Sequence, residues 1–151
     1  MRFKEFEGEW EIKKLGEVSN VSKLAGYEFT KYVVYQDTGK IIALRGLNVK
    51  NNSLDLSDVK YIDESDLSKL NRSKLFINDL MFTYIGTIGE VALIDENDRF
   101  YLAPNVSRIR IDKDKVVPHF LLQYFNNPRF RNTEIAKYIS SSSQPALTMK
   151  N

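Results

Sequence analysis

LMFTYIGTIGEVALID, residues Leu80 to Asp95, is the stretch that decides the fold. Residues 80–85 and 90–94 are two runs of apolar, aromatic and β-branched side chains, so both are predicted to be strands of a buried sheet. Gly-Thr-Ile-Gly between them predicts a hairpin, because glycine accepts the positive φ angles that a short reversal requires. The loop also offers backbone N–H groups and the Thr87 hydroxyl to a phosphate or a base edge. Its sequence alone does not separate a structural turn from a ligand contact.

Composition and length indicate one ordinary globular domain. The chain has 151 residues, 42% of them hydrophobic and 28% charged, and no apolar run reaches the ~18 residues needed to cross a bilayer. The N-terminus is charged and lacks the apolar segment of a signal peptide, so a cytoplasmic location is expected. The absence of cysteine excludes disulfides, thiolate zinc sites and a cysteine nucleophile. The single histidine, His119, follows a proline at an expected helix start, which leaves almost nothing for histidine-based catalysis.

Positive charge is concentrated in the C-terminal third of the chain. The net charge is +2, yet residues 108–151 carry eight Lys or Arg against three acidic residues, while residues 1–107 carry fourteen against seventeen. A clustered basic face supplies the sequence-independent part of nucleic-acid binding. A solvated helix face produces the same asymmetry, so charge alone leaves a polyanion partner and an ordinary surface equally open.

Hydrophobic periodicity predicts further strands followed by helices. Strands are expected at residues 40–45, 59–62, 100–103 and 106–111, the last with its arginines facing outward. Helices are expected at 65–70, at 118–126 after Pro118, and at 128–139 after an Asn127-Pro128 cap. We therefore expect an α+β fold, in which a curved, mostly antiparallel sheet or partial β-barrel is followed by C-terminal helices that pack on it.

Two polar motifs accompany this pattern. Arg45 and Asn48 follow the strand at 40–45, and their side chains are the types that bind guanine and adenine edges bidentately in a major groove. An arginine paired with a carboxylate and an asparagine in a turn are the competing interpretations. Four serines at 140–143, followed by Gln144, suit either a flexible linker or a loop that contacts phosphates or bases.

Four stretches stand in a specific order and spacing along the chain. They are EWEIKKLGEV at 9–18, LMFTYIGTIGEVAL at 80–93, APNVSRIR at 103–110, and FLLQYFNNPRFRN with SSSSQPALTMKN between 120 and 151. Together they resemble the target recognition domain of Type I restriction-modification specificity subunits. The resemblance covers nearly the whole chain and implies a DNA-recognition module without catalysis of its own.

The resemblance also implies partners. In that family a full specificity subunit has two such domains, each reading one half of a split DNA target, separated by long helices that hold the methyltransferase subunits. The implied partners are double-stranded DNA, the methyltransferase and restriction subunits of the same system, and a second recognition domain or a second copy of the chain. Residues 1–151 are expected to form a single recognition domain that ends before the first spacer helix.

No cofactor or metal site is expected, because the chain has no G-x-G-x-x-G motif, no aspartate- or asparagine-Pro-Pro-aromatic motif and no recognisable carboxylate cluster. The residues expected to neutralise DNA phosphates are Arg108, Arg110, Arg129, Arg131, Ser141 and Ser142. Those expected to contact base edges are Arg45, Asn48, Tyr84, Thr87 and Gln144. Two other functions compete: a self-associating half-length interaction module, and an enzyme domain whose loop at 86–89 binds a nucleotide phosphate.

Overall fold

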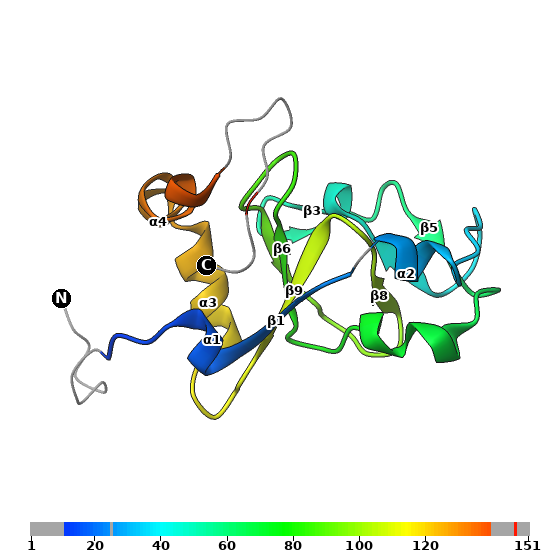
Figure 1. Ribbon diagram of the computed structural model, residues 1–151, viewed down its shortest axis with the longest axis horizontal. Helices are drawn as coiled ribbons and strands as arrows, with labels where there is room; N and C mark the ends of the chain where they lie inside the picture. Colours follow the sequence, from blue (N-terminus) through cyan, green and yellow to red (C-terminus); the bar gives the residue numbers. More distant parts are fainter. Residues whose placement is uncertain (1–10, 25, 140–146, 148–151) are drawn as a thin grey trace.

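The computed structural model describes residues 11–24, 26–139 and 147. They form three small sheets, with helices α3 and α4 at one end of the long axis and α2 near the other (Figure 1). The strand orders are β1-β9-β6-β7, β5-β2-β8 and β3-β4. The strands are β1 (Ser19–Lys23), β2 (Ile42–Leu44), β3 (Val49–Lys50), β4 (Ser53–Leu54), β5 (Lys60–Tyr61), β6 (Leu80–Thr83), β7 (Val91–Leu93), β8 (Phe100–Leu102) and β9 (Val106–Ile111). The fold is α+β as predicted, and none of these sheets closes into a barrel.

The predicted central hairpin is confirmed. Strands β6 and β7 pair antiparallel with Leu80 opposite Leu93, and the loop between them has Gly86 at φ 76° and Gly89 at φ 89°. Strand β9 pairs antiparallel with the other edge of β6, and β1 pairs antiparallel with β9. The sequence did not predict β1, because SNVSK holds one apolar residue and shows no clear alternation.

The second sheet contains a parallel pair that the sequence did not predict. Strand β2 pairs antiparallel with β5 but parallel with β8, with Ile42 opposite Phe100 and Leu44 opposite Leu102. Parallel strands leave a sheet at the same edge. The segments that follow β2 and β8, beginning at Arg45 and Ala103, therefore emerge side by side.

The C-terminal helices are α3 (Pro118–Asn126), α4 (Pro128–Thr133) and the 3₁₀ helix η3 (Ile135–Tyr138). The Asn127 side chain accepts a hydrogen bond from the Arg129 N–H at 2.9 Å, which confirms the predicted cap. The predicted second helix is correct only to Thr133, whose hydroxyl donates back to the Arg129 carbonyl, and the chain continues as η3.

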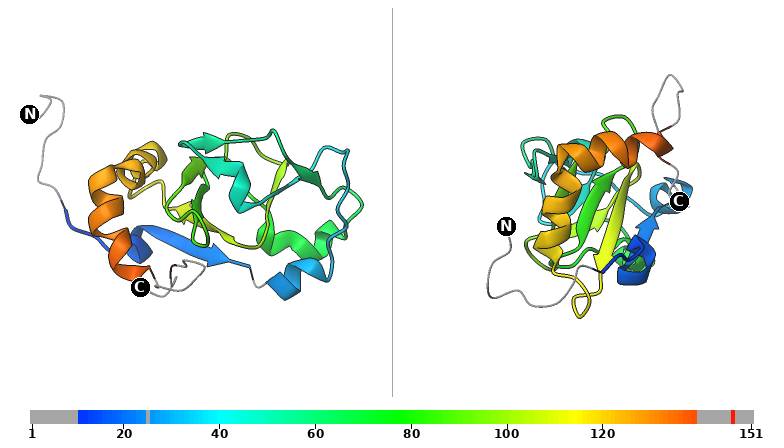
Figure 2. Two further views of the ribbon diagram at one scale, coloured as in Figure 1. Left: turned by 90° about the horizontal axis from the view of Figure 1, so that it is seen from above. Right: turned by 90° about the vertical axis from the view of Figure 1, so that its left-hand side faces the viewer.

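These helices bury an apolar face against the central sheet (Figure 2). The Phe125 ring lies 5.6 Å from that of Phe82 on β6 and 5.2 Å from that of Phe130 on α4, both in edge-on geometry. The remaining helices are short: α1 (Leu15–Val18), α2 (Gly26–Thr30), η1 (Gly46–Asn48) and η2 (Leu67–Ser73). Within the described ranges, no helix combines the length and the apolar character that a bilayer crossing demands.

The prediction that the β9 arginines face outward is wrong for Arg108. Every residue of β9 except Arg110 is buried, and Arg108 is only 7% exposed. The cause is tertiary: β1 pairs along β9 and the backbone of η2 also approaches, so that Arg108 donates to both the Ser22 hydroxyl and the Arg72 carbonyl. Neither neighbour is visible in the local pattern of β9.

Candidate nucleic-acid interface

An open groove of about 500 Å³ lies between three segments of the chain, with Tyr35 added from a fourth. It is lined by Tyr35, Arg45, Gly46, Leu47, Thr83, Ile85, Thr87, Pro104 and Asn105. The parallel pairing of β2 with β8 places the segment after Leu44 beside the turn at 104–105. The β6–β9 pairing, with Thr83 opposite Val106, adds the hairpin loop as the third wall. The fold thus brings together Arg45 and Thr87, two residues predicted to contact base edges.

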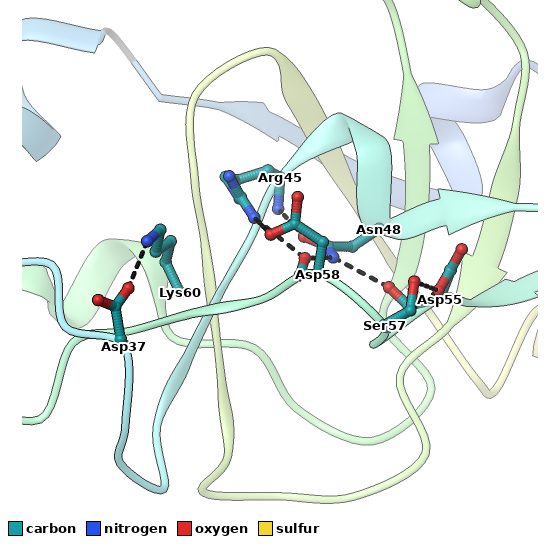
Figure 3. Close-up of polar contacts among 7 residues, drawn as sticks. All are labelled: Asp37, Arg45, Asn48, Asp55, Ser57, Asp58 and Lys60. Carbon is teal, nitrogen blue, oxygen red and sulfur yellow. Dashed lines mark hydrogen bonds and ion pairs between the residues drawn. The ribbon is translucent and has the colours of Figure 1, made fainter.

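One nitrogen of the Arg45 guanidinium forms an ion pair, and 26% of the side-chain surface remains exposed. Its Nη2 donates at 3.0 Å to both the backbone carbonyl and the carboxylate of Asp58 (Figure 3). The side chain of Asp58 is 68% exposed, so the pair lies at the water interface. The Arg45 Nε is buried and has no hydrogen-bond partner. The carboxylate pairing anticipated as an alternative is present, and it leaves part of the guanidinium without a partner.

Asn48 lies inside the protein. It is 0% exposed, its side-chain oxygen accepts from the Arg45 N–H, and its NH₂ donates to the carbonyls of Asp55 and Asp58 (Figure 3). The three distances lie between 2.8 and 3.0 Å. These hydrogen bonds fix the backbone of the loop between Arg45 and Asp58, as expected for an asparagine in a turn. Asn48 therefore supports the groove without lining it.

The hairpin loop is closed by Thr83. Its hydroxyl donates to the Thr87 carbonyl and accepts from the Glu90 N–H at 2.9 Å, while its own carbonyl accepts from the Gly89 N–H. The polar groups of Thr83 thus bond to other residues of the hairpin, and the Thr87 side chain remains exposed at the tip of the loop. The loop is therefore a preformed turn with one outward hydroxyl.

Tyr84 is an almost buried residue beside the groove. It is 6% exposed, and burial raises the pKa of its phenol, an effect partly offset by a hydrogen bond with the Asn105 backbone. The Lys23 ammonium lies 5.5 Å from the centroid of its ring. Direct contact between Tyr84 and a base is therefore limited in this arrangement, but the ring connects Lys23 to the groove residue Asn105.

The two arginines of α4 differ in their partners. Arg131 forms an ion pair with Glu90 at 3.5 Å, and its guanidinium lies against Gly89, where an added Cβ would stand 3.2 Å from Nε. The Glu90 carboxylate also accepts from the Asn51 N–H. Arg129 is exposed, and its side chain has no ion pair within the part of the chain that the structure describes. Of the two, Arg129 carries the uncompensated charge.

The two arginines of β9 differ more strongly. The guanidinium of Arg110 donates to both oxygens of Asp79, at 2.9 and 2.8 Å, and these hydrogen bonds raise the pKa of Arg110. Asp79 is 3% exposed and also accepts from the Phe76 N–H. Arg108 has no carboxylate partner within the described ranges, and its Nε is buried without a hydrogen bond. The pKa of Arg108 is lowered mainly by burial and, to a lesser extent, by repulsion from the charge of Arg110.

Arg108 and Arg110 line a second, smaller hollow of about 170 Å³, together with Ser22, Lys23, Leu24, Asn71, Arg72 and Leu102. Sequence reasoning selected the two β9 arginines but not Lys23 or Arg72. Only the pairing of β1 with β9 and the approach of η2 bring those residues into the same place. The local sequence therefore does not place Lys23 or Arg72 beside Arg108.

Ser141, Ser142 and Gln144, the remaining predicted contacts, lie outside the described residues. Among the residues that are described, no group of three His, Cys, Asp or Glu side chains is placed to hold a metal ion.

Three comparisons with known proteins all match specificity proteins of Type I restriction systems. A family model described as the Type I restriction modification DNA specificity domain matches residues 7–151. The specificity subunit of the Type I restriction enzyme EcoBI from Escherichia coli is 27% identical over 85 residues, which make up 56% of this chain and 18% of that protein. A crystal structure of a Type I restriction-modification S subunit from M. genitalium superposes with a TM-score of 0.57 over 91% of this chain and 30% of that one. At 11% identity the latter likeness concerns the fold, and the chain spans less than a third of either relative.

Proposed function

The chain belongs to the Type I restriction modification DNA specificity domain family, and on that premise we propose that it reads one half of a split double-stranded DNA target. In this role it performs no catalytic step of its own and supplies sequence recognition to a multisubunit enzyme. The observation that carries the proposal is the groove between Arg45, Thr87 and Asn105, where polar side chains from three segments converge on one concave surface.

Arg45 is the principal base-reading residue in this proposal. A guanidinium recognises guanine through its O6 and N7 atoms, and such a bidentate contact discriminates against other bases by about 1–3 kcal/mol. Its bond to the exposed Asp58 carboxylate is a surface ion pair, which is worth only about 0–1 kcal/mol. The exchange of Asp58 for a base edge is therefore inexpensive, and the Asn48 scaffold keeps the backbone of Arg45 in place during it.

Thr87 and Tyr35 complete the reading surface. The Thr87 hydroxyl stands at the tip of a closed loop and can donate or accept, so it suits several base edges. Tyr35 also lines the groove and is 46% exposed, so its aromatic face can pack against a base or a thymine methyl group. Because the loop is shaped by Thr83 and by Gly89, little ordering is required when DNA arrives.

Arg129 is proposed to fix the position of the domain without reading sequence. Arg129 is exposed, has no ion pair with any described residue, and lies on α4, the helix whose Arg131 contacts the hairpin loop. Such an arginine can neutralise a phosphate and release condensed counterions on binding. A single domain makes few such contacts, so we expect weak binding by the isolated chain. The methyltransferase and restriction subunits and a second recognition domain, the partners proposed from the family, would raise the affinity through multivalency.

A comparison of Arg45→Ala with Arg129→Ala tests this division. Each variant is assayed on duplex DNA recovered by selection with the wild-type chain and on scrambled duplexes, over a range of salt concentrations. Arg45→Ala should lose discrimination at one base position, by about 1–3 kcal/mol, with an unchanged salt slope. Arg129→Ala should weaken binding on all sequences and reduce the slope of log K against log salt by about 1. Equal and sequence-independent losses in both variants would contradict the division.

A further inference from the structure

Arg108 is a buried cation without a counterion. It is 7% exposed, it pairs with no carboxylate within the described ranges, and two of its nitrogens donate to neutral acceptors, the Ser22 hydroxyl at 3.0 Å and the Arg72 carbonyl at 3.2 Å. The third nitrogen, Nε, is buried and has no hydrogen bond. A buried charge in this condition is unfavourable unless an opposite charge compensates it. The positive charge of Arg108 is therefore uncompensated in the free protein.

The surroundings of Arg108 increase that imbalance. Lys23, Arg72 and Arg110 line the same hollow, and none of its lining residues carries a carboxylate. The nearest compensating group is Asp79, whose two oxygens are both bound by Arg110. Arg72 reaches only a marginal contact with Glu28, at 3.4 Å, and its side chain is 82% exposed. The hollow therefore presents three cationic side chains, of Arg108, Lys23 and Arg72, that no buried carboxylate neutralises.

From this arrangement we propose that the hollow is a binding pocket for one phosphate group, in which Arg108 is the central ligand and Ser22, Lys23 and Arg72 are the flanking ones. Arginine suits this role because its planar fork of N–H donors matches phosphate oxygens. The volume of about 170 Å³ is well above the ~10–15 Å³ that one water molecule requires, so the hollow has room for a tetrahedral oxyanion. A bound phosphate would supply the missing negative charge beside the buried guanidinium.

The position of the pocket suggests which phosphate it takes. Lys23 belongs to the pocket and also lies over the ring of Tyr84, which in turn is hydrogen-bonded to the backbone of Asn105 in the reading groove. The pocket and the groove are thus joined through a single ring. In the proposal, one backbone phosphate of the DNA seats on Arg108 and fixes the register of the bases in the groove, and this part rests on the proposed function.

Inorganic phosphate is the first probe, because it tests the pocket without DNA. Inorganic phosphate is titrated into the whole chain at constant ionic strength, and binding is measured by calorimetry and by thermal unfolding. We expect saturable binding and a rise in Tm that chloride does not produce. Lys23→Gln, an exposed position whose substitution spares the core, should weaken phosphate binding by about tenfold or more. Arg108→Lys keeps the charge but lacks the fork and should do the same. Arg99→Gln removes one positive charge elsewhere and should leave phosphate affinity unchanged.

Ethylation interference then identifies the source of the phosphate. Ethylating individual phosphates of a selected duplex should reveal one phosphate whose modification impairs binding to the wild-type chain but makes no further difference to Lys23→Gln. Absence of saturable phosphate binding, or equal binding by wild type and both pocket variants, would overturn the pocket. Phosphate binding with an interference pattern identical in wild type and Lys23→Gln would overturn the DNA backbone as its source. Phosphate binding without any DNA binding would instead overturn the proposed function and leave the pocket intact.

Discussion

Replacement of Asn48 by alanine separates the scaffold of the groove from its reading surface. Asn48 is completely buried and makes three hydrogen bonds, one from the Arg45 N–H and two to the carbonyls of Asp55 and Asp58. Alanine removes all three and leaves the Arg45 N–H and the Asp55 carbonyl without this partner, while the Asp58 carbonyl keeps its hydrogen bond from Arg45 Nη2. The Asn48 side chain itself does not line the groove, so the substitution acts on folding stability.

The expected magnitude follows from these bonds. A buried hydrogen bond contributes about 0.5–1.5 kcal/mol net, and a partner left unsatisfied adds to the cost. Three bonds therefore predict a loss of roughly 2–4 kcal/mol in the free energy of unfolding. At about 2–4 °C per kcal/mol for a chain of this size, Tm should fall by roughly 4–16 °C. Any loss of DNA affinity should disappear at low temperature, where the variant is folded.

Urea unfolding followed by circular dichroism measures the change, with the slope m as a check that both proteins unfold from the same compact state. Asn132→Ala on α4 is the matched control, because Asn132 is exposed and an exposed substitution should change stability by less than about 0.5 kcal/mol. The bases preferred in a selection should be the same for Asn48→Ala and the wild type. A variant of near wild-type stability that prefers different bases would refute the scaffold role and return Asn48 to the reading surface.

Two further predictions concern the hairpin loop and the turn beside the groove. Gly86→Ala and Gly89→Ala both strain a positive φ, but only the latter places a Cβ 3.2 Å from the Arg131 guanidinium, so it should destabilise by about 1 kcal/mol more in urea unfolding; equal losses would show that Arg131 yields freely. Hydrogen bonds from Lys50 and then Ser57 hold the pKa of Asp55 well below its ordinary value of 3.8, so this carboxylate stabilises the folded chain above about pH 4, and the contribution is lost as the pH falls. The stability difference between wild type and Asp55→Asn should accordingly shrink on acidification from pH 6 to pH 3, and a constant difference would contradict it.

The elements with strong local signals are the ones that the sequence predicted. The β6–β7 hairpin, the strand at 106–111 and the proline-started helix at 118–126 stand at or within a residue or two of the expected bounds. In the hairpin, glycine permits the positive φ of the turn, while β-branched residues favour the strands and proline fixes φ at the start of the helix. The fold class followed from those elements, while the parallel β2–β8 pair did not, because strand direction depends on the path of a long intervening segment.

The candidate site was harder to predict because exposure and partners are tertiary properties. Arg45 and Thr87 were selected by side-chain chemistry, and the fold brings them into one groove. Arg110 was selected by the same reasoning, yet its guanidinium is hydrogen-bonded to both carboxylate oxygens of Asp79. Lys23 was not selected, although β1 places it in the pocket of Arg108, since a polar strand of five residues has no distinctive pattern.

Selection of duplexes from a random pool, performed with the wild-type chain and with Arg45→Ala at two salt concentrations, tests the reading function most directly. For the wild type we expect a short common half-site, with binding that weakens as salt rises. The Arg45→Ala pool should keep that half-site except at one position, where the preference relaxes. A wild-type pool without any common sequence at either salt concentration, even when the methyltransferase subunit is added, would contradict sequence recognition by this domain.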